Sequence, residues 1–180
     1  LVDGYTGATM LGQAATSTGA LELINVDGTQ ASLSDMILGF IPGSIGETSV
    51  IAIAIGAIIL LWSGIASWRT MFSVFAGGIV MAITFNLFGS EANVMSQLPW
   101  FEHLALGGFC FGAVFMATDP VTSARTETGK YIYGFIIGAM AIIIRVLNPG
   151  YPEGMMLSIL LMNIFAPLID YIVVQKNITA

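Results

Sequence analysis

The fold is decided by the stretch Val50-Ile51-Ala52-Ile53-Ala54-Ile55-Gly56-Ala57-Ile58-Ile59-Leu60-Leu61-Trp62, which holds no charged residue. It lies within an apolar run near 49–67, and a helix needs about 20 apolar residues to cross the hydrocarbon core of a bilayer. Four more runs of this kind follow near 71–88, 98–117, 131–147 and 154–174. The sequence therefore predicts an all-α, polytopic membrane bundle of about five transmembrane helices.

The composition of the whole chain agrees with a membrane protein. Mean hydropathy is +0.88, and only 9% of the 180 residues are charged. A soluble domain would be far more polar. The net charge of −6 argues against nucleic acid as a partner and leaves membrane lipid as the expected surroundings. The single cysteine, Cys110, excludes an internal disulfide; we expect a small packing residue, or alternatively one ligand in a site shared between subunits.

Charge and run length divide the chain into three parts. Residues 1–48 contain five acidic residues and neither Lys nor Arg, and are predicted to be an extracytoplasmic segment. The apolar piece 36–44 is too short to span, so we expect a re-entrant or buried turn there. Residues 49–174 are the predicted five-helix bundle, and 175–180 a cytoplasmic tail. The chain opens on Leu1 with no signal-peptide pattern, and we expect it to be part of a longer protein.

The basic residues predict the orientation. Four of them fall on one side of a five-span bundle: Arg69, Arg125, Lys130 and Lys176. The positive-inside rule makes that side cytoplasmic. We therefore expect the amino-terminal segment outside the cytoplasm and the carboxy terminus inside it. Arg145, near the outer end of the fourth run, is the exception, and we expect a specific partner to explain it.

A short motif opens the chain: Asp3-Gly4-Tyr5-Thr6-Gly7-Ala8-Thr9. It is too small-sided for a core element. The glycines allow positive φ and Ala8 adds almost no bulk, so Thr9 is predicted to present an exposed hydroxyl. An ordinary glycine-rich turn is the alternative interpretation of these residues taken alone.

This motif resembles the flavinylation sequence Asp-Gly-x-Ser/Thr-Gly-Ala-Thr, with Thr6 in place of the commoner Ser. That sequence occurs in the B subunits of sodium-translocating NADH:quinone oxidoreductases and in the related membrane flavin subunits of Rnf complexes. The similarity continues over most of the chain, through Met10–Ala15, Phe115–Thr122, Asn148–Gly154 and the last span with Asn163 and Asp170. The chain resembles the carboxy-terminal half of such a protein.

The resemblance implies a cofactor and a site. Thr9 would carry FMN through a phosphoester on its side-chain oxygen, attached by a flavin transferase on the periplasmic side. The rest of the motif would shape the attachment site: Asp3, Gly4, Thr6, Gly7 and Ala8. Thr9 would not itself react in turnover, because electron transfer belongs to the flavin ring. No catalytic residue and no metal site is assigned.

The resemblance also implies a role within a larger assembly. Electrons from NADH would pass through this FMN towards quinone and drive Na⁺ export, with NADH bound by another subunit. Riboflavin and quinone would bind elsewhere in the full subunit, and the isolated chain would not turn over. The implied fold is one half of an inverted repeat related to urea transporters, which agrees with a re-entrant turn before the spans.

Four residues near the cytoplasmic side are candidates for ion translocation: Thr118, Asp119, Asn163 and Asp170. Intramembrane acids are functional hypotheses by default, and Na⁺ prefers carboxylate, carbonyl and hydroxyl oxygens. The alternative is structural, with Asp119 capping a turn and Asp170 reaching water. The lone histidine, His103, is expected to form a satisfied interfacial pair with Glu102 rather than a metal or proton site.

Two other functions stay open. An Rnf-type protein, which couples ferredoxin and NAD, would carry the same kind of flavin motif. A passive channel or transporter on the same scaffold would have no covalent cofactor and would need a polar path. The absence of a continuous polar line along any predicted span counts modestly against a channel.

Overall fold

Long apolar helices form the centre of the computed structural model, which describes residues 8–17, 23–90 and 93–179. Three of these helices are long and apolar enough to cross a membrane: α4 (Trp68–Phe88), α8 (Glu127–Leu147) and α9 (Met155–Thr179). A fourth apolar helix, α3 (Val50–Trp62), has 13 residues. Within the described ranges there is no strand beyond one isolated bridge between Ile24 and Gln30. The prediction of an all-α polytopic bundle is confirmed.

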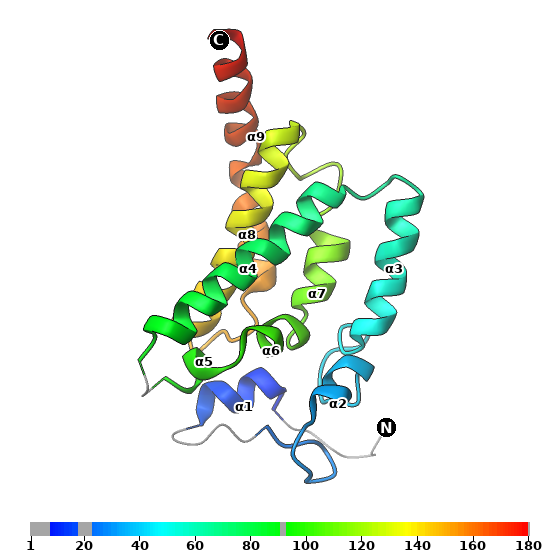
Figure 1. The fold of residues 1–180 in the computed structure, drawn as a ribbon, viewed down its shortest axis with the longest axis vertical. Helices are drawn as coiled ribbons and strands as arrows, with labels where there is room; N and C mark the ends of the chain where they lie inside the picture. Colours follow the sequence, from blue (N-terminus) through cyan, green and yellow to red (C-terminus); the bar gives the residue numbers. More distant parts are fainter. Residues whose placement is uncertain (1–7, 18–22, 91–92, 180) are drawn as a thin grey trace.

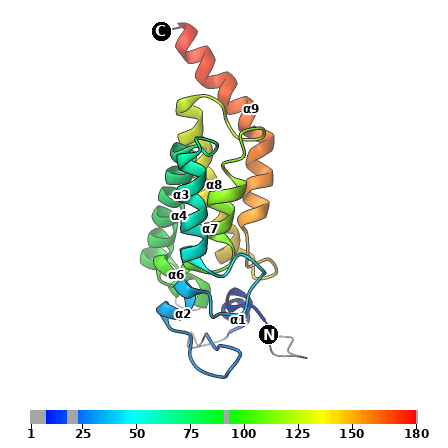
Figure 2. The ribbon, with the colours of Figure 1, turned by 90° about the vertical axis from the view of Figure 1, so that its right-hand side faces the viewer.

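The helices pass back and forth between two ends of the bundle. In Figures 1 and 2, α3, α4, α7 (Phe109–Phe111), α8 and α9 follow one another in alternating directions. We call one end the basic end, because the connections at 63–67 and 117–126 meet there beside three basic residues, Arg69, Arg125 and Lys130. The opposite end, here the amino-terminal end, gathers α1 and the other short helices.

The short helices at the amino-terminal end are α1 (Met10–Thr16), α2 (Leu33–Leu38), α5 (Val94–Gln97) and α6 (Trp100–Ala105). Helix α2 begins with a capping box between Ser32 and Asp35 and ends at Gly39, whose φ is 94°. This left-handed residue turns the chain out of the helix. The predicted turn at 36–44 therefore consists of the end of α2 and its following loop, and its entry into a membrane stays a prediction.

The third predicted run, 98–117, does not form one continuous helix. Helix α6 ends at Ala105, and the chain turns at Gly107 and Gly108, whose φ values are 63° and 64°. It then restarts as α7 and the π-helical segment η1 (Gly112–Met116). Two consecutive left-handed residues cannot lie inside an α-helix, which is why an apolar run of spanning length is interrupted here.

Glycines allow α4 and α8 to pack closely. A Cβ on Gly138 would lie 2.0 Å from the carbonyl oxygen of Val74, and one on Gly77 would lie 2.1 Å from that of Phe135. The Ser73 hydroxyl also donates to the Tyr131 carbonyl across this interface. Gly134 and Gly138 are four residues apart in α8, a spacing of small residues that predicts a close helix contact, and the structure confirms that contact.

A second pair with the same spacing, Gly108 and Gly112, serves two different purposes. Gly112 does serve close packing, since its Cβ would meet Met155 Cγ at 2.5 Å. Gly108 instead supplies positive φ at the helix break. The spacing alone does not distinguish a packing glycine from a turning one.

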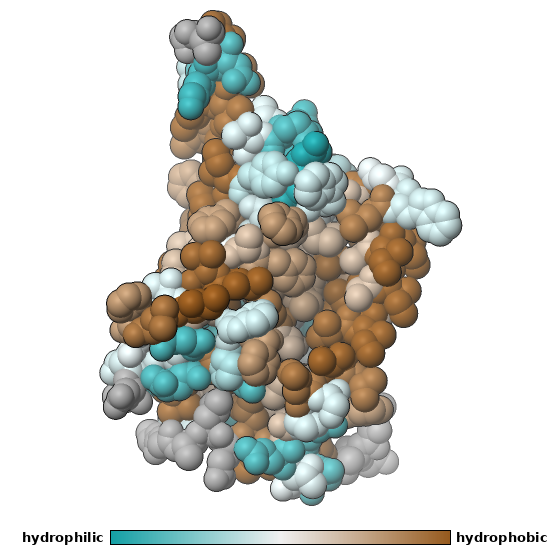
Figure 3. All heavy atoms as spheres, in the orientation of Figure 1, coloured by the Kyte–Doolittle hydropathy of each residue, from teal (hydrophilic) through white to brown (hydrophobic). Residues whose placement is uncertain are grey.

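Apolar side chains cover much of the outside of the bundle. Figure 3 shows hydrophobic surface along the helices, with hydrophilic residues gathered towards the two ends. Ile164 on α9 is 74% exposed and Ile58 on α3 is 63% exposed. Such an outward apolar face fits a lipid surrounding and agrees with the spanning lengths of the helices.

Candidate functional site

Thr9 begins helix α1 at the amino-terminal end. Its backbone is extended, and its side-chain oxygen accepts a hydrogen bond from the Gly12 backbone N–H at 3.2 Å, so it acts as the N-cap. The same hydroxyl lies 3.5 Å from Glu153 Oε1, to which it can donate. The Thr9 side chain is half-buried, and the preceding Ala8 is exposed. The hydroxyl is therefore held in a defined position at the edge of the protein.

Helix α1 is fixed against the bundle on two sides. Met10, Leu11 and Ala14 are buried in the main core cluster. On the other side, Gln13 Nε2 donates to the carbonyls of Ala8 and Ile24, at 3.3 and 3.0 Å. These contacts orient the residue just before Thr9 and hold the hydroxyl in place.

A small cavity of about 20 Å³ lies beside Thr9. Glu47 and Glu153 contribute carboxylates to its wall, and Gly107 and Gly108 from the helix break form another side. The two glycines leave room for these carboxylates, because a Cβ on Gly107 would lie 2.6 Å from Glu153 Oε2. A cavity of this size holds about one water and is far too small for a flavin ring.

The two carboxylates influence each other. Burial raises the pKa of Glu47 above its ordinary value, and the negative charge of Glu153 raises it further. The Thr9 hydroxyl therefore stands in an acidic environment, and a phosphate added there would be another anion. Such a group is accommodated only where it can extend outward into solvent.

Arg145 holds together the residues behind this cavity. It is fully buried, and its Nη1 donates to the His103 carbonyl at 2.5 Å. Its Nη2 donates to three further backbone carbonyls, those of Leu106, Gly107 and Glu153, at 3.2–3.3 Å. The carbonyls freed by the end of α6 and the glycine turn are thereby satisfied by one side chain.

Glu153 joins this network to Thr9. Its backbone carbonyl accepts from Arg145, while its side chain faces the Thr9 hydroxyl. The specific partner expected for Arg145 is thus a set of carbonyls within the same chain. Sequence reasoning missed Glu47 and Glu153 as neighbours of Thr9. One sequence signal could have pointed to this network. A buried arginine without a nearby acid needs backbone carbonyls as acceptors, and a helix break at Gly107-Gly108 would leave carbonyls free to bind it.

The structure describes only the last two residues of the motif. Asp3, Gly4, Thr6 and Gly7 lie outside the described residues. Ala8 and Thr9 are described, and Ala8 directly precedes the N-cap. The role of the whole motif in cofactor binding therefore stays a prediction.

The candidates for ion translocation lie towards the basic end and each has a local partner. Asp119 accepts from the backbone and hydroxyl of Thr122 at 3.1 and 2.7 Å, and these bonds lower its pKa. Thr118 is buried and donates to the Val114 carbonyl at 2.6 Å. Asn163 on α9 accepts from the Tyr133 hydroxyl on α8.

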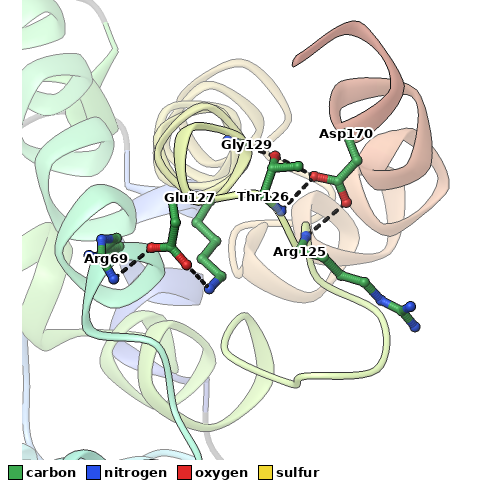
Figure 4. A network of polar contacts seen from close by, with 7 residues as sticks. Arg69, Arg125, Thr126, Glu127, Gly129 and Asp170 are labelled. Atoms are coloured by element: carbon green, nitrogen blue, oxygen red, sulfur yellow. Dashed lines mark hydrogen bonds and ion pairs between the residues drawn. The ribbon is translucent and has the colours of Figure 1, made fainter. Parts of the chain in front are cut away.

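Asp170 connects α9 to the start of α8. Its carboxylate accepts from the backbone N–H groups of Arg125 and Thr126, at 2.8 and 2.9 Å, and from the Thr126 hydroxyl at 2.6 Å. Figure 4 shows this arrangement beside the ion pairs of Glu127 with Arg69 and Lys130. The carboxylate thus helps to cap α8, which is a structural role that an ion-binding role would have to share.

The expected interfacial pair of Glu102 and His103 is wrong. His103 is fully buried, and neither ring nitrogen has a hydrogen-bond partner within the described residues. The Glu102 Oε2 atom is likewise buried without one. Because α6 turns its last residues into the bundle at the helix break, His103 faces the core instead of the interface. Cys110 is buried, with its thiol 3.2 Å from the Leu104 carbonyl, in agreement with a packing role.

These features define a class: an integral membrane protein with a bundle of apolar helices, and with a fixed threonine hydroxyl at the end opposite its exposed basic residues. Comparison with known proteins then identifies the family. The model of the NQR2, RnfD, RnfE family matches residues 1–179, and the chain belongs to this family.

Several curated relatives share one name, which describes the B subunit of a Na(+)-translocating NADH-quinone reductase. The chain is 53% identical to the protein from Chromohalobacter salexigens over 178 residues, 98% of this chain and 42% of that one. It is 54% identical to the protein from Klebsiella pneumoniae strain 342 over 177 residues, 98% of this chain and 43% of that one. The match falls in the carboxy-terminal part of these relatives, and the chain spans less than half their length.

Proposed function

We propose that this chain is the covalent-flavin part of a membrane redox subunit in a Na⁺-translocating NADH:quinone reductase of the bacterial inner membrane. The observation that carries the proposal is the fixed Thr9 hydroxyl at the edge of the bundle, at the position that the flavinylation motif designates. The names of the similar proteins, at more than 50% identity, support the assignment to this kind of complex.

The residues around Thr9 fit a phosphoester-linked FMN. Gly12 leaves space beside the acceptor oxygen, since a Cβ there would lie 3.3 Å from Thr9 Oγ1. Ala8 is small and exposed, so the acceptor can be reached from outside. The neighbouring cavity admits no flavin ring, and the ring would therefore lie on the surface of this chain and face a neighbouring part of the assembly. When bound, the flavin supplies the one-electron and two-electron chemistry.

The chain's own residues would position the attachment point. Gln13 holds Ala8, and the Gly12 N–H holds the Thr9 oxygen. Glu47 and Glu153 close the inner side with negative charge, which directs an anionic phosphate outward. In this proposal the amino-terminal end faces the periplasm, where the transferase acts, and quinone, riboflavin and NADH bind to other parts of the complex.

Peptide mass spectrometry of the full-length protein tests the proposal. The protein is purified from membranes of cells that contain a competent flavin transferase. We expect the mass of FMN less water on the peptide containing Thr9, its loss in Thr9→Val, and its retention in Thr9→Ser. Unmodified Thr9 in such a preparation would overturn the flavin assignment and move the transporter alternative to first place.

The four polar residues towards the basic end are proposed as contributors to Na⁺ uptake: Thr118, Asp119, Asn163 and Asp170. Their oxygen atoms are of the types that Na⁺ prefers, and three of the four bind neighbours at the cytoplasmic end of this topology. An Rnf-type function remains the second candidate, since the family includes RnfD. Reductase assays with NADH and with reduced ferredoxin in the assembled complex separate the two.

A further inference from the structure

The basic end contains a cavity of about 520 Å³ between the α3–α4 connection and the 117–126 loop. Among the described residues that line it, every charged side chain is basic: Arg69, Arg125 and Lys130. Ser67, Thr118 and Ser123 also line it, and of these the Thr118 hydroxyl already donates to the Val114 carbonyl. A cavity with this lining is complementary to an anion that accepts several hydrogen bonds.

Arg125 is the cation best placed for such a ligand. Its backbone N–H is fixed by Asp170 at 2.8 Å, while its guanidinium is turned away from that carboxylate (Figure 4). The residue is exposed. Guanidinium offers a fork of N–H donors that fits two oxygens of one phosphate group. The fixed backbone also reduces the entropy lost when the side chain binds.

Arg69 and Lys130 stand on the other side of the same cavity. Both contact Glu127, at 2.6 and 2.8 Å, and this carboxylate holds the two cations in place. One acid shared between two bases leaves a positive excess, and the N–H groups not directed at Glu127 can still donate. Arg69 and Lys130 therefore line one side of the cavity and Arg125 lines the other, with its guanidinium extending outward, away from Arg69 (Figure 4).

The surroundings of the cavity are those of a membrane interface. Trp68 is 53% exposed, lies edge-on to Tyr131 and has the Arg69 guanidinium 5.1 Å from its ring centroid. Tryptophans of this kind are typical of the headgroup level. Leu61 and Ile65 add an apolar wall, and Ile65 is 60% exposed. A soluble phosphate would gain nothing from this wall, whereas an acyl chain would pack against it.

We propose that this cavity binds the phosphate headgroup of an anionic phospholipid. The exposed Arg125 guanidinium turns inward to hold the phosphate together with Arg69 and Lys130, and the acyl chains lie against Leu61 and Ile65. Basic pockets between helices at the cytoplasmic surface recognise anionic headgroups in this way. The proposal concerns the basic end and does not depend on the flavin at Thr9.

Native mass spectrometry of the full-length protein in its assembled complex tests this site, with phosphatidylglycerol and phosphatidylcholine as probes. We expect Arg125→Gln to weaken phosphatidylglycerol binding by about tenfold, which is the effect of losing one to two charge-assisted hydrogen bonds. The matched control is Lys176→Gln, which removes a cation outside the cavity lining and should leave binding unchanged.

Several outcomes would overturn the proposal. Equal retention of phosphatidylglycerol by wild type and Arg125→Gln would rule out the proposed contact between Arg125 and the phosphate. Equal binding of phosphatidylcholine would remove the charge selectivity. Displacement of the lipid by millimolar inorganic phosphate would identify a soluble anion as the ligand, and an acidic protein segment cross-linked to position 125 would identify a protein partner. The phosphatidylcholine measurement and the displacement by inorganic phosphate use the wild-type protein, so both test the proposal even if the variant does not fold.

Discussion

The two ends of the bundle use arginine in opposite ways. At the amino-terminal end, Arg145 is fully buried and donates to four backbone carbonyls. At the basic end, Arg69 is partly exposed and forms an ion pair with Glu127. A buried guanidinium is tolerated only where acceptors satisfy its N–H donors, as these carbonyls do. An exposed guanidinium contributes little to stability and stays available for ligands. The difference separates a structural cation from a binding one.

The largest effect on folding is expected at the packing of α4 against α8, because both ends of the bundle depend on this contact. Gly138→Val would place carbon atoms within about 2 Å of the Val74 carbonyl. We expect little or no folded protein in the membrane, because a backbone clash cannot be relieved by a side-chain rotation. Expression and gel filtration in detergent measure this. The matched control is Thr128→Val, an exposed position on the same helix, and equal behaviour of the two variants would contradict the close packing.

Removing the buried cation should damage the amino-terminal end. Arg145→Met removes a donor from four backbone carbonyls, of which, among the described residues, Glu153 alone keeps a second donor, the Met155 N–H at 2.7 Å. We expect a loss of about 3 kcal/mol or more. Thermal unfolding of the purified full-length protein measures the change. Arg69→Met at the basic end is the paired control, with an expected loss of about 1 kcal/mol or less. If both variants lost the same stability, the contrast between the ends would fail.

A smaller effect is expected at the basic end itself. Asp170→Ala removes the acceptor for the N–H groups of Arg125 and Thr126, and a lost cap costs about 1–2 kcal/mol. Hydrogen exchange should become faster in the first turn of α8, with the amides around Thr9 unchanged. Asp27→Ala, which removes an exposed carboxylate bonded only within its own turn, serves as the control. Faster exchange at Thr9 would mean that the two ends are not independent.

The smallest effect concerns the acid beside Thr9. The pKa of Glu47 is raised in the folded protein above its ordinary 4.5, so the protonated form favours folding. This contribution is fully present below pH 4.5 and is lost as the pH rises through the raised pKa. Glu47→Gln should therefore be more stable than wild type at neutral pH, by at most about 1 kcal/mol, and equally stable near pH 4.

Asp35 provides a control of opposite sign for this pH dependence. Hydrogen bonds from Ser32 lower the pKa of Asp35 below its ordinary 3.8. Its stabilising contribution is present above pH 3.8 and is lost as the pH falls through the lowered pKa. Asp35→Asn should thus be less stable than wild type at neutral pH. Unfolding temperatures of both variants between pH 3 and 8 make the comparison.

Sequence predicted the regular parts of this fold well. Apolar runs and small-residue spacing correctly indicate α4, α8 and their contact at Gly138, because both patterns are local properties of a helix face. The break at Gly107 and Gly108 could not be read from the 98–117 run. Glycine is tolerated inside membrane helices, and the left-handed turn at these residues depends on the tertiary partner Arg145, which binds the Gly107 carbonyl.

The candidate site was predictable only in part, for a similar reason. The motif points to Thr9 because the proposed modification would be directed by a short local sequence. Glu153 is 144 residues away along the chain, and no local pattern connects it to Thr9. The position of Glu47 likewise depends on how the loop after α2 folds back. The chemistry of a short motif can be predicted from the sequence, whereas the charges around it depend on tertiary contacts.

The Arg145 network also constrains the order in which the chain can mature during synthesis. The carbonyls of His103, Leu106 and Gly107 leave the ribosome well before α8 brings the guanidinium that satisfies them. Until then, the segment around the glycine turn is poorly suited to a lipid surrounding and should stay within the protein-lined insertion machinery. Insertion of α8 then lets α6, α7 and the 148–154 loop settle together. Thr9 can therefore reach its final neighbour Glu153 only after the 148–154 loop has been made.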